Sequence, residues 1–393
     1  MQSKQFDVVV AGCGVAGLSA AVAAAEAGAK VAIVERAPIE ERGGQSRYTE
    51  AYLRMKSETE VTDDFETHIA ENCSGYLDPE LVGETVSSRE QRSAAARALS
   101  ITDPDVIQTL ADEAGPTIAW MKQLGVRFDF LPTQFLTKSQ PRLLPVGGGA
   151  ALVEALAAQA ETKSVVFFYE TTATGLETDG EGKVIGLVTR SRENGHAVLK
   201  GKVVLASGGF EGNAEMLSRY MGPRSVHLRP VCKGGYFNRG EGIQMALDMG
   251  AAVAGDFGSY HAEPIDPRAA GSEPSVFIFP YGILVNKDGE RFTDEAPGTV
   301  DAYYERVTRR IYEQRDGLAY VVLDAKHMQV PNYRLAIRTD QPPIAAETIE
   351  DLAKALEIQP EKLTATVERY NVSGVLRPFR WLGSSRAGVH RGD

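Results

Sequence analysis

The segment from Phe6 to Glu35 constrains the fold of this chain more than any other, because it reads as a strand, a glycine turn, a helix and a second strand. Phe6–Ala11 is a continuous apolar run, as expected of a strand buried on both faces of a parallel sheet. Gly12, Gly14 and Gly17 follow at the spacing G-x-G-x-x-G. This order of elements predicts a βαβ unit that binds a dinucleotide.

Each of these glycines has an expected role in such a unit. Gly12 makes the tight turn, Gly14 lets the backbone approach a pyrophosphate, and Gly17 lets the helix pack closely on the strand. The helix begins near Val15 and Ala16, where free N–H groups and the positive end of the helix dipole suit a phosphate.

The second strand of the unit ends in an acid. Glu35 stands at about the spacing expected for a ligand of a ribose hydroxyl, and Arg36 follows it as a further candidate contact. The apolar run 8–25 could instead be a signal peptide or a membrane anchor. The fingerprint glycines, with Asp7 before the run and Glu26 after it, argue against both.

The composition predicts a soluble, cytoplasmic enzyme. A chain of 393 residues is long enough for more than one domain. The net charge of −11 argues against nucleic acid or an anionic membrane as a partner. Cys13, Cys73 and Cys232 form neither a zinc pattern nor a disulfide framework, which indicates a reducing compartment and no metal site. We expect no transmembrane segment.

Three further glycine-rich stretches suggest backbone close to a ligand. Gly43 and Gly44 precede Ser46, and the alternative is a plain tight turn. The run 147–149 precedes an expected helix over 150–160, where it could hold an anion or serve as a flexible entry. The third stretch ends a buried strand, and its candidate contacts are Ala206, Gly208 and Gly209.

Between these stretches the pattern predicts both helices and strands. Pro104 is expected to begin a helix that runs to about residue 114. Strands separated by turn residues are expected further on, over 165–169, 173–178, 184–191 and 197–206.

Taken together, these motifs resemble the fumarate reductase/succinate dehydrogenase flavoprotein family. The resemblance rests on the N-terminal fingerprint, R-G-G-x-S at 42–46, L-A-S-G-G-F-x-x-N at 205–213, G-E-G-I at 240–243 and G-E-R-F at 289–292. Within this family the chain is most similar to the FAD-dependent tricarballylate dehydrogenases, on segments 44–52 and 291–304.

The resemblance implies that FAD is the cofactor. It assigns Gly12, Gly14 and Gly17 to the pyrophosphate turn and Glu35 to the adenosine ribose. It also assigns Gly43, Gly44 and Ser46 to a loop along the flavin, and Ala206, Gly208 and Gly209 to a strand end near the cofactor. Gln45 and Ser46 stand where some relatives carry a linking histidine, so non-covalent FAD is expected.

The resemblance also implies the fold class, which is α/β. A Rossmann-type FAD-binding domain with a β-meander is interrupted by an α+β capping domain. The expected divisions are 1–224 for the first part of the FAD-binding domain, 225–345 for the capping domain, 346–372 for the return to the FAD-binding domain, and 373–393 for an atypical tail.

The function implied is that of an FAD-dependent oxidoreductase acting on CH–CH bonds of a small polycarboxylate, with an electron acceptor that is unknown. His261, Tyr281 and Arg291 are the candidate catalytic residues, and the alternative for His261 is a structural histidine. Fumarate reductases carry an acid-catalyst arginine shortly after the Arg-Phe-x-x-Glu motif. The stretch 295–301 has no arginine, so fumarate reduction by that mechanism is not expected.

The end of the chain departs from the family. After Ser373 the family pattern stops, and the tail is basic, with Arg377, Arg380, Arg386 and Arg391. Such a tail predicts a truncated or divergent C-terminal segment. For the chain alone, we expect weak FAD binding, no turnover and aggregation. Two alternatives therefore stay open. One is a ketosteroid dehydrogenase-like flavoenzyme with an apolar, tyrosine-bearing pocket, and the other is a catalytically silent truncated flavoprotein.

Overall fold

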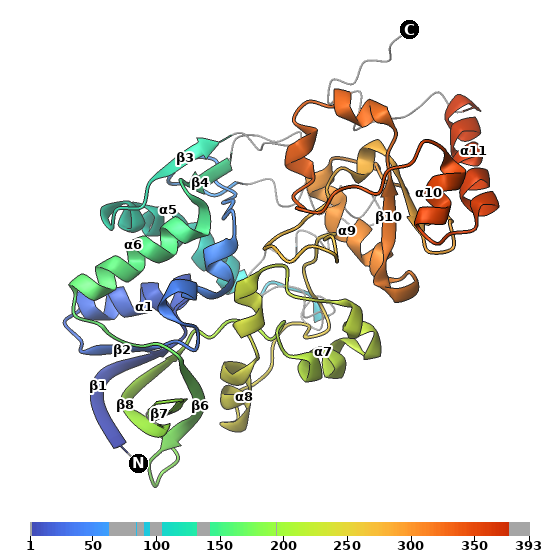
Figure 1. Cartoon of the computed structure of the whole chain (residues 1–393). Helices are drawn as coiled ribbons and strands as arrows, with labels where there is room; N and C mark the ends of the chain where they lie inside the picture. The colour runs from blue at the N-terminus through green and yellow to red at the C-terminus, as the bar shows by residue number, and fades with distance from the viewer. Residues whose placement is uncertain are drawn as a thin grey trace. The chain divides into compact units, whose positions relative to one another are not determined.

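The computed structural model describes residues 2–62, 84, 90–94, 104–131, 142–193 and 195–376. Within these residues the chain forms two compact units (Figure 1). The first unit comprises the described residues of 2–131, 142–222 and 232–259, and the second comprises 223–231 and 260–376. The basic tail from residue 377 onward lies outside the described residues.

The first unit is built on a six-stranded sheet with the strand order β5-β2-β1-β8-β7-β6. Strands β5, β2, β1 and β8 run parallel to one another, and β8, β7 and β6 form an antiparallel meander in the same sheet. The sheet strands are β1 (Gln2–Ala11), β2 (Val31–Val34), β5 (Val166–Phe168), β6 (Thr171–Thr178), β7 (Val184–Ser191) and β8 (Gly195–Leu205). The predicted βαβ unit and meander are both confirmed. β1 begins four residues before the predicted start at Phe6, and the ends of the other strands are shifted by at most two residues.

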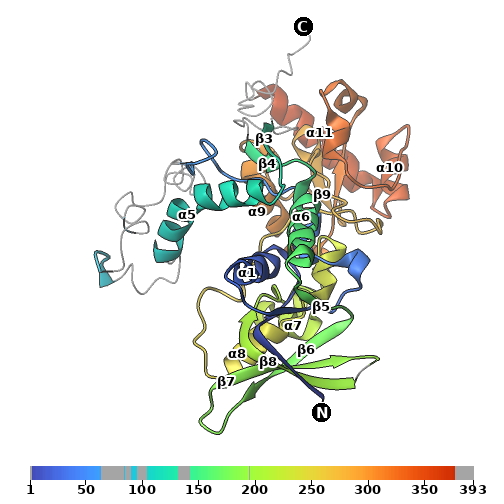
Figure 2. The same ribbon diagram turned by 90° about the vertical axis from the view of Figure 1, so that its left-hand side faces the viewer.

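The side chains of β1 point to both faces of the sheet, so the core of this unit is divided between the two faces. Val10 packs with residues of α1 (Val15–Glu26) and α6 (Gly148–Thr162) on one face. Figures 1 and 2 show these two helices beside the sheet. Phe6 and Val9 pack on the other face with Met245 of α8 (Glu241–Asp248). Burial on both faces is what the unbroken apolar sequence of β1 requires.

Smaller elements complete the first unit. The helix α5 (Pro104–Gln123) extends well beyond the predicted end at residue 114, because Ile118 is buried in a cluster with Met55 and Leu143 and Trp120 packs against the core of α1 and α6. A two-stranded sheet pairs β3 with β4. The remaining elements are β3 (Phe128–Leu131), β4 (Arg142–Pro145), η1 (Ile39–Glu41), η2 (Gly44–Tyr48), α7 (Ala214–Met221) and η4 (Lys233–Phe237).

The second unit is organised around the antiparallel pair β9 (Ile283–Asn286) and β10 (Ala319–Val322). Leu284 faces α9 (Val300–Tyr312), whereas Ile283 and Val285 face α10 (Ile349–Ala355) and α11 (Pro360–Leu376). The strand pair is thus covered by helices on both faces (Figure 1). The short helices of this unit are η3 (Pro223–His227), η5 (Phe279–Tyr281), η6 (Arg315–Gly317), η7 (Ala325–Gln329) and η8 (Tyr333–Ala336).

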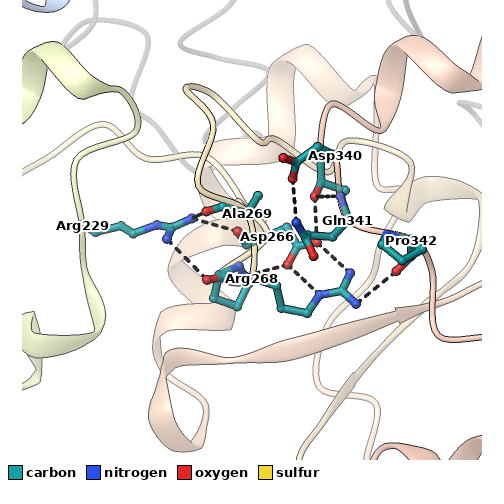
Figure 3. A network of polar contacts seen from close by, with 9 residues as sticks. Arg229, Asp266, Arg268, Ala269, Asp340, Gln341 and Pro342 are labelled. Atoms are coloured by element: carbon teal, nitrogen blue, oxygen red, sulfur yellow. Dashed lines mark hydrogen bonds and ion pairs between the residues drawn. The ribbon is translucent and has the colours of Figure 1, made fainter.

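A polar network centred on Asp266 fixes the loops of the second unit (Figure 3). The Asp266 carboxylate is buried and accepts hydrogen bonds from the Arg268 guanidinium at 2.7 and 3.0 Å and from the Thr339 hydroxyl at 2.9 Å. Arg229 donates to the Asp266 carbonyl at 2.8 Å, and Arg268 donates to the Pro342 carbonyl at 3.1 Å. The network joins three stretches that are distant in the sequence.

The compact units differ from the predicted domain divisions in two places. Residues 346–372 were expected to return to the FAD-binding domain, but α10 and α11 pack on β9 and β10 of the second unit. Residues 232–259 were expected in the capping domain, yet they belong to the first unit because η4 and α8 pack there. No helix in the described part of the chain is both long and apolar enough to cross a membrane.

Candidate cofactor site

A cavity of about 250 Å³ opens at the carboxyl ends of the parallel strands. These strands end at the same level, because Ala11 is paired with both Val34 and Leu205. The next residue along each strand therefore lies at one edge of the sheet, where ligands of open α/β sheets bind. Gly12, Glu35 and Ala206 occupy these positions and line the cavity.

Two of the three fingerprint glycines are required by the packing of the protein itself. Gly12 has φ +108°, a conformation that L side chains rarely adopt. A Cβ there would also overlap the carbonyl oxygen of Ala206, and a Cβ at Gly17 would overlap the carbonyl oxygen of Gly12. These two glycines therefore shape the turn and seat α1 on the sheet.

Gly14 differs from the other two. Its φ is −70°, and a Cβ there would make ordinary contacts, at 3.4 Å from Ser46 Oγ and 3.6 Å from the Gly43 carbonyl oxygen. The protein itself could accommodate that atom. Because Gly14 lines the cavity, the missing side chain leaves room for a ligand close to the backbone.

The N-terminus of α1 is suited to an anion. Its N-cap residue provides no side-chain cap, and its first turn carries no acid. The Val15 N–H donates to Ser46 Oγ at 3.3 Å, and Ala16 lines the cavity. The positive end of the helix dipole at this cavity favours a phosphate group.

Glu35 is a buried carboxylate fixed by two backbone groups. Its side chain is 8% exposed, and its oxygens accept hydrogen bonds from the Cys13 N–H at 2.9 Å and the Ala37 N–H at 2.8 Å. A carboxylate can accept about four hydrogen bonds, so it retains capacity for ligand hydroxyls.

Burial, followed by the neighbouring Glu35 charge, raises the pKa of the Cys13 thiol to about 12, so the thiol stays protonated.

The loop at η2 is held by close packing rather than by flexible glycines. A Cβ at Gly149 would overlap the carbonyl oxygen of Ser46, and a Cβ at Gly234 would overlap that of Gly44. The Gly149 N–H also donates to the Thr49 carbonyl at 2.7 Å. For Gly149, therefore, neither the anion site nor the flexible entry that the sequence suggested describes its role. It lets α6 approach η2.

The structure brings most of the predicted cofactor residues together. The predicted residues that line the cavity are Gly12, Gly14, Ala16, Glu35, Arg36, Gly43, Gly44, Ser46, Ala206 and Gly208. The other three are adjacent: Val15 donates to Ser46, Gly17 packs on Gly12, and the Gly209 carbonyl accepts from the Gly240 N–H at 3.1 Å.

Sequence reasoning missed part of the lining. Gln45, Phe237 and Asn238 line the cavity, as do Glu241 and Met245 of α8. Arg36 forms an ion pair with Glu241 at 2.5 Å. The G-E-G-I motif could have identified Glu241 as a residue of the cavity, although the sequence alone gave this motif no role.

The three candidate catalytic residues lie in the second unit and have different surroundings. His261 Nε2 lies 2.6 Å from the Tyr304 hydroxyl, and the imidazole is exposed. Tyr281 lies in η5, where burial raises its pKa to about 12.

Arg291 is held by an acid of its own loop. Its Nε and terminal nitrogen donate to the Glu295 carboxylate at 2.9 and 2.6 Å, and its guanidinium lies over the Tyr370 ring. Glu295 in turn accepts from the Leu284 N–H of β9 at 2.8 Å. This geometry gives Arg291 a structural role in fixing the loop to β9.

A family model for an FAD binding domain matches residues 7–374. The chain belongs to this family. FAD is accordingly its cofactor, and its class is that of the FAD-dependent oxidoreductases. The N-terminus of α1, whose N-cap residue is a glycine, and the buried Glu35 carboxylate fit the pyrophosphate and ribose of this cofactor.

Relatives of this FAD binding domain include several reductases. The vinyl phenol reductase of Lactiplantibacillus plantarum is 25% identical, over 93% of this chain and 76% of its own length. The fumarate reductase (cytochrome) of Shewanella frigidimarina is 26% identical, over 93% of this chain. This chain spans 60% of the length of that relative.

A solved structure confirms the predicted fold class. The open conformation of a flavocytochrome c3 fumarate reductase superposes with a TM-score of 0.72, at 22% identity, over 95% of this chain and 62% of the other. The family model and the fumarate reductase relatives support the resemblance to the wider family. The closer resemblance to tricarballylate dehydrogenases stays a prediction.

Proposed function

We propose that this chain binds FAD non-covalently in the cavity at the ends of β1, β2 and β8, and oxidises or reduces a CH–CH bond of a small polycarboxylate such as tricarballylate. The observation that carries the proposal is the cavity itself. The N-terminus of α1 and the Glu35 carboxylate line the same space, together with a glycine that leaves its backbone accessible.

In this proposal the chain's own residues bind and orient the cofactor. The N–H groups at the start of α1 bind the pyrophosphate, and Glu35 accepts hydrogen bonds from the ribose hydroxyls. Bound FAD supplies hydride transfer. Non-covalent attachment is supported by Gln45 and Ser46, which stand where some members of the family that the sequence resembles carry a linking histidine.

The substrate class is supported by the resemblance and by the relatives. A urocanate reductase of Eggerthella lenta, 25% identical over 94% of this chain and 59% of its own length, joins the fumarate reductases. Fumarate and urocanate are both unsaturated carboxylates. For this chain we accordingly propose a carboxylate-bearing substrate whose carbon–carbon bond adjoins the carboxylate.

The reaction also requires proton exchange at the neighbouring carbon, and we propose His261, with its partner Tyr304, and Tyr281 as candidates for it. His261 and Tyr304 can share a proton across their 2.6 Å contact. Tyr281, with a pKa raised to about 12 by burial, keeps its proton at neutral pH and would act as a donor. Arg291, engaged by Glu295, is the weakest of the three candidates.

A second candidate function is that of a ketosteroid dehydrogenase, and aromatic residues near His261 favour it. The His261 and Tyr304 ring centroids lie 5.5 Å apart, and those of Tyr304 and Phe277 lie 5.4 Å apart. A 3-ketosteroid-Δ4-(5α)-dehydrogenase structure from Rhodococcus jostii superposes with a TM-score of 0.64, at 23% identity, over 98% of this chain and 81% of the other.

Anaerobic titration of the purified flavoprotein distinguishes these functions. Bleaching of the oxidised flavin absorbance by tricarballylate, with a saturated 3-ketosteroid leaving it unchanged, would support the proposed function and contradict the lack of turnover that the basic tail predicts. Bleaching by the steroid alone would favour the second candidate. A protein that binds FAD but reacts with neither compound, and whose reduced flavin is not reoxidised by fumarate, urocanate or vinyl phenol, would be the catalytically silent alternative.

A further inference from the structure

Three segments of the first unit converge beside the cofactor cavity. They are η2, the strand end over 206–213, and η4 with the residues that follow it. Backbone contacts join them: the Gly212 N–H donates to the Asn238 carbonyl at 2.8 Å, and Gly234 packs directly against the backbone of Gly44. Side chains at this junction are therefore carried on fixed backbone.

Glu211 lies at this junction and receives two side-chain amides. Its Oε1 accepts a hydrogen bond from Asn238 Nδ2 at 2.6 Å and another from Gln45 Nε2. Both amide residues line the cavity. One carboxylate therefore organises two polar groups on the cavity wall.

The paired glycines of the strand end make room for this arrangement. A Cβ at Gly208 would lie 2.8 Å from the Asn238 amide, and a Cβ at Gly209 would lie 2.7 Å from Glu211 Oε2. The L-A-S-G-G-F motif thus accommodates the carboxylate and its amide partner in addition to any ligand.

We propose that Glu211 is a positioning residue, which orients the Gln45 and Asn238 amides toward the bound cofactor and places a negative charge near the flavin that lowers its reduction potential. This inference rests on the proposed function, in which FAD occupies the cavity and the η2 loop lies along the flavin.

The orientation follows from the donor and acceptor capacities of the groups. An ionised carboxylate only accepts hydrogen bonds, whereas an amide has two N–H donors and one acceptor oxygen. A flipped amide would direct its oxygen at the carboxylate, so the charge of Glu211 fixes which end of Gln45 and Asn238 faces it. The Gln45 oxygen accepts from Cys232 Sγ at 3.9 Å, which fixes that amide at its other end.

Each amide then retains hydrogen-bonding capacity for a ligand. One N–H of each is used by Glu211, and the second N–H remains as a donor. The isoalloxazine ring presents carbonyl acceptors and an N–H donor at its pyrimidine edge, which such amides complement. Burial raises the pKa of the Glu211 carboxyl, and hydrogen bonds from its own backbone and from the Asn238 amide offset part of that rise.

The effect on the potential follows from electrostatics. Reduction adds electrons to the flavin, and a nearby negative charge opposes that addition. Removing the charge while keeping the shape of the side chain should therefore make the flavin easier to reduce.

The test compares Glu211→Gln, Glu211→Ala and the control Glu215→Gln, which changes an exposed α7 side chain that pairs with Arg219. The readouts are the FAD dissociation constant and the flavin midpoint potential. Glu211→Gln should keep the affinity within about threefold and raise the potential, because a neutral isostere loses only part of the hydrogen bonding. Glu211→Ala should weaken FAD about tenfold, since both amides lose their partner. Glu215→Gln should change neither value.

A double-mutant cycle with Asn238→Leu tests whether Glu211 acts through the amides. In the Asn238→Leu background, Glu211→Ala should weaken FAD less than it does in the wild type, and full additivity would contradict the positioning role. The inference is overturned if FAD-loaded Glu211→Gln has the wild-type potential. A wild-type protein that takes up no FAD would overturn the proposed function as well, so the two failures are distinguishable.

Discussion

At the scale of single residues, the fingerprint glycines divide into those that the fold needs and one that the ligand needs. Gly12 and Gly17 have no room for a Cβ because backbone carbonyls occupy the space, whereas Gly14 has ordinary contacts only. The sequence motif predicts all three glycines but cannot separate these roles, because the atoms concerned come from Ala206 and from the turn itself. A substitution at Gly14 should consequently affect binding without preventing folding.

We expect Gly14→Val to abolish FAD binding while the protein stays folded. The added methyl groups would extend from a Cβ that lies at the edge of the cavity, where the backbone must approach the pyrophosphate. Flavin content per folded protein, with folding checked by circular dichroism, measures the effect. Gly180→Val is the matched control, since a Cβ at Gly180 meets no atom within 4 Å. Retention of full flavin content by Gly14→Val would contradict the assignment.

Glu35→Gln should weaken FAD by about 1.5–3 kcal/mol, the usual value of hydrogen bonds to a charged group. The glutamine keeps the size of the side chain and one acceptor oxygen, but its NH₂ group then faces one of the two backbone N–H donors, of Cys13 or Ala37. The more drastic Glu35→Ala should also lower the stability of the apoprotein, because those two N–H groups lose their acceptor. Isothermal titration with FAD measures the first effect, and a dissociation constant within twofold of wild type would exclude the ribose contact.

At the scale of secondary-structure elements, the glycines of 147–149 show what a local pattern cannot decide. The sequence offered an anion site or a flexible entry to α6, and both interpretations use only neighbouring residues. The structure shows that the carbonyl oxygen of Ser46, from a distant part of the sequence, occupies the space beside Gly149. Contacts of this kind depend on tertiary packing, which is why a single sequence does not reveal them.

Gly149→Ala should displace η2 and weaken FAD, although Gly149 does not line the cavity. The added methyl group would overlap the Ser46 carbonyl, so either α6 or η2 must move. We expect at least a tenfold rise in the dissociation constant, about 1.4 kcal/mol, together with a lower melting temperature. Gly180→Ala serves as the control. An unchanged dissociation constant would mean that η2 does not contribute to the cofactor site.

The Asp266 network makes a prediction about stability and pH. Burial alone would raise the pKa of Asp266, but hydrogen bonds from Arg268 and Thr339 outweigh it and lower the pKa. Asp266→Asn should therefore lower the free energy of unfolding by about 1–2 kcal/mol near neutral pH, with partial exposure of Arg268 limiting the effect.

This stabilisation should be lost in acid. Because the folded pKa is depressed, it is fully present above the unfolded pKa of about 3.9 and disappears as the pH falls through the lower folded value. The difference between wild type and Asp266→Asn in urea denaturation should accordingly shrink below that pH. Asp340→Asn is the control and should show no such difference, since Asp340 is an exposed neighbour that accepts a hydrogen bond from the Gln341 amide. A difference that stays constant with pH would exclude ionised Asp266 as its source.

At the scale of the whole molecule, periodicity and turn chemistry predicted the sheet. They did not predict to which compact unit the later segments of the chain belong. The apolar run of β1, the fingerprint and the spaced strands up to residue 206 specify a parallel sheet that continues into a meander, and the structure has both. The predicted domain divisions placed residues 232–259 in the capping domain and 346–372 in the FAD-binding domain, whereas the compact units place them the other way round. Their amphipathic helices show that one face is buried, but not against which sheet, because a helix pattern does not identify its partner.

The position of the cavity predicts where FAD should alter the dynamics of the chain. All residues that line it belong to the first unit, so FAD should slow amide hydrogen exchange mainly in peptides covering 11–17, 43–48 and 206–211. At a FAD concentration of 100 times the dissociation constant, binding stabilises the state that binds it by about 2.7 kcal/mol, which corresponds to a marked decrease in opening of these segments. Peptides of β9 and β10, in the second unit, should exchange at nearly the same rate with and without FAD. Exchange measured by mass spectrometry on the Gly14→Val protein gives the baseline, since added FAD should protect none of its peptides. Equal protection of both units in the wild type would contradict a cofactor site built from the first unit.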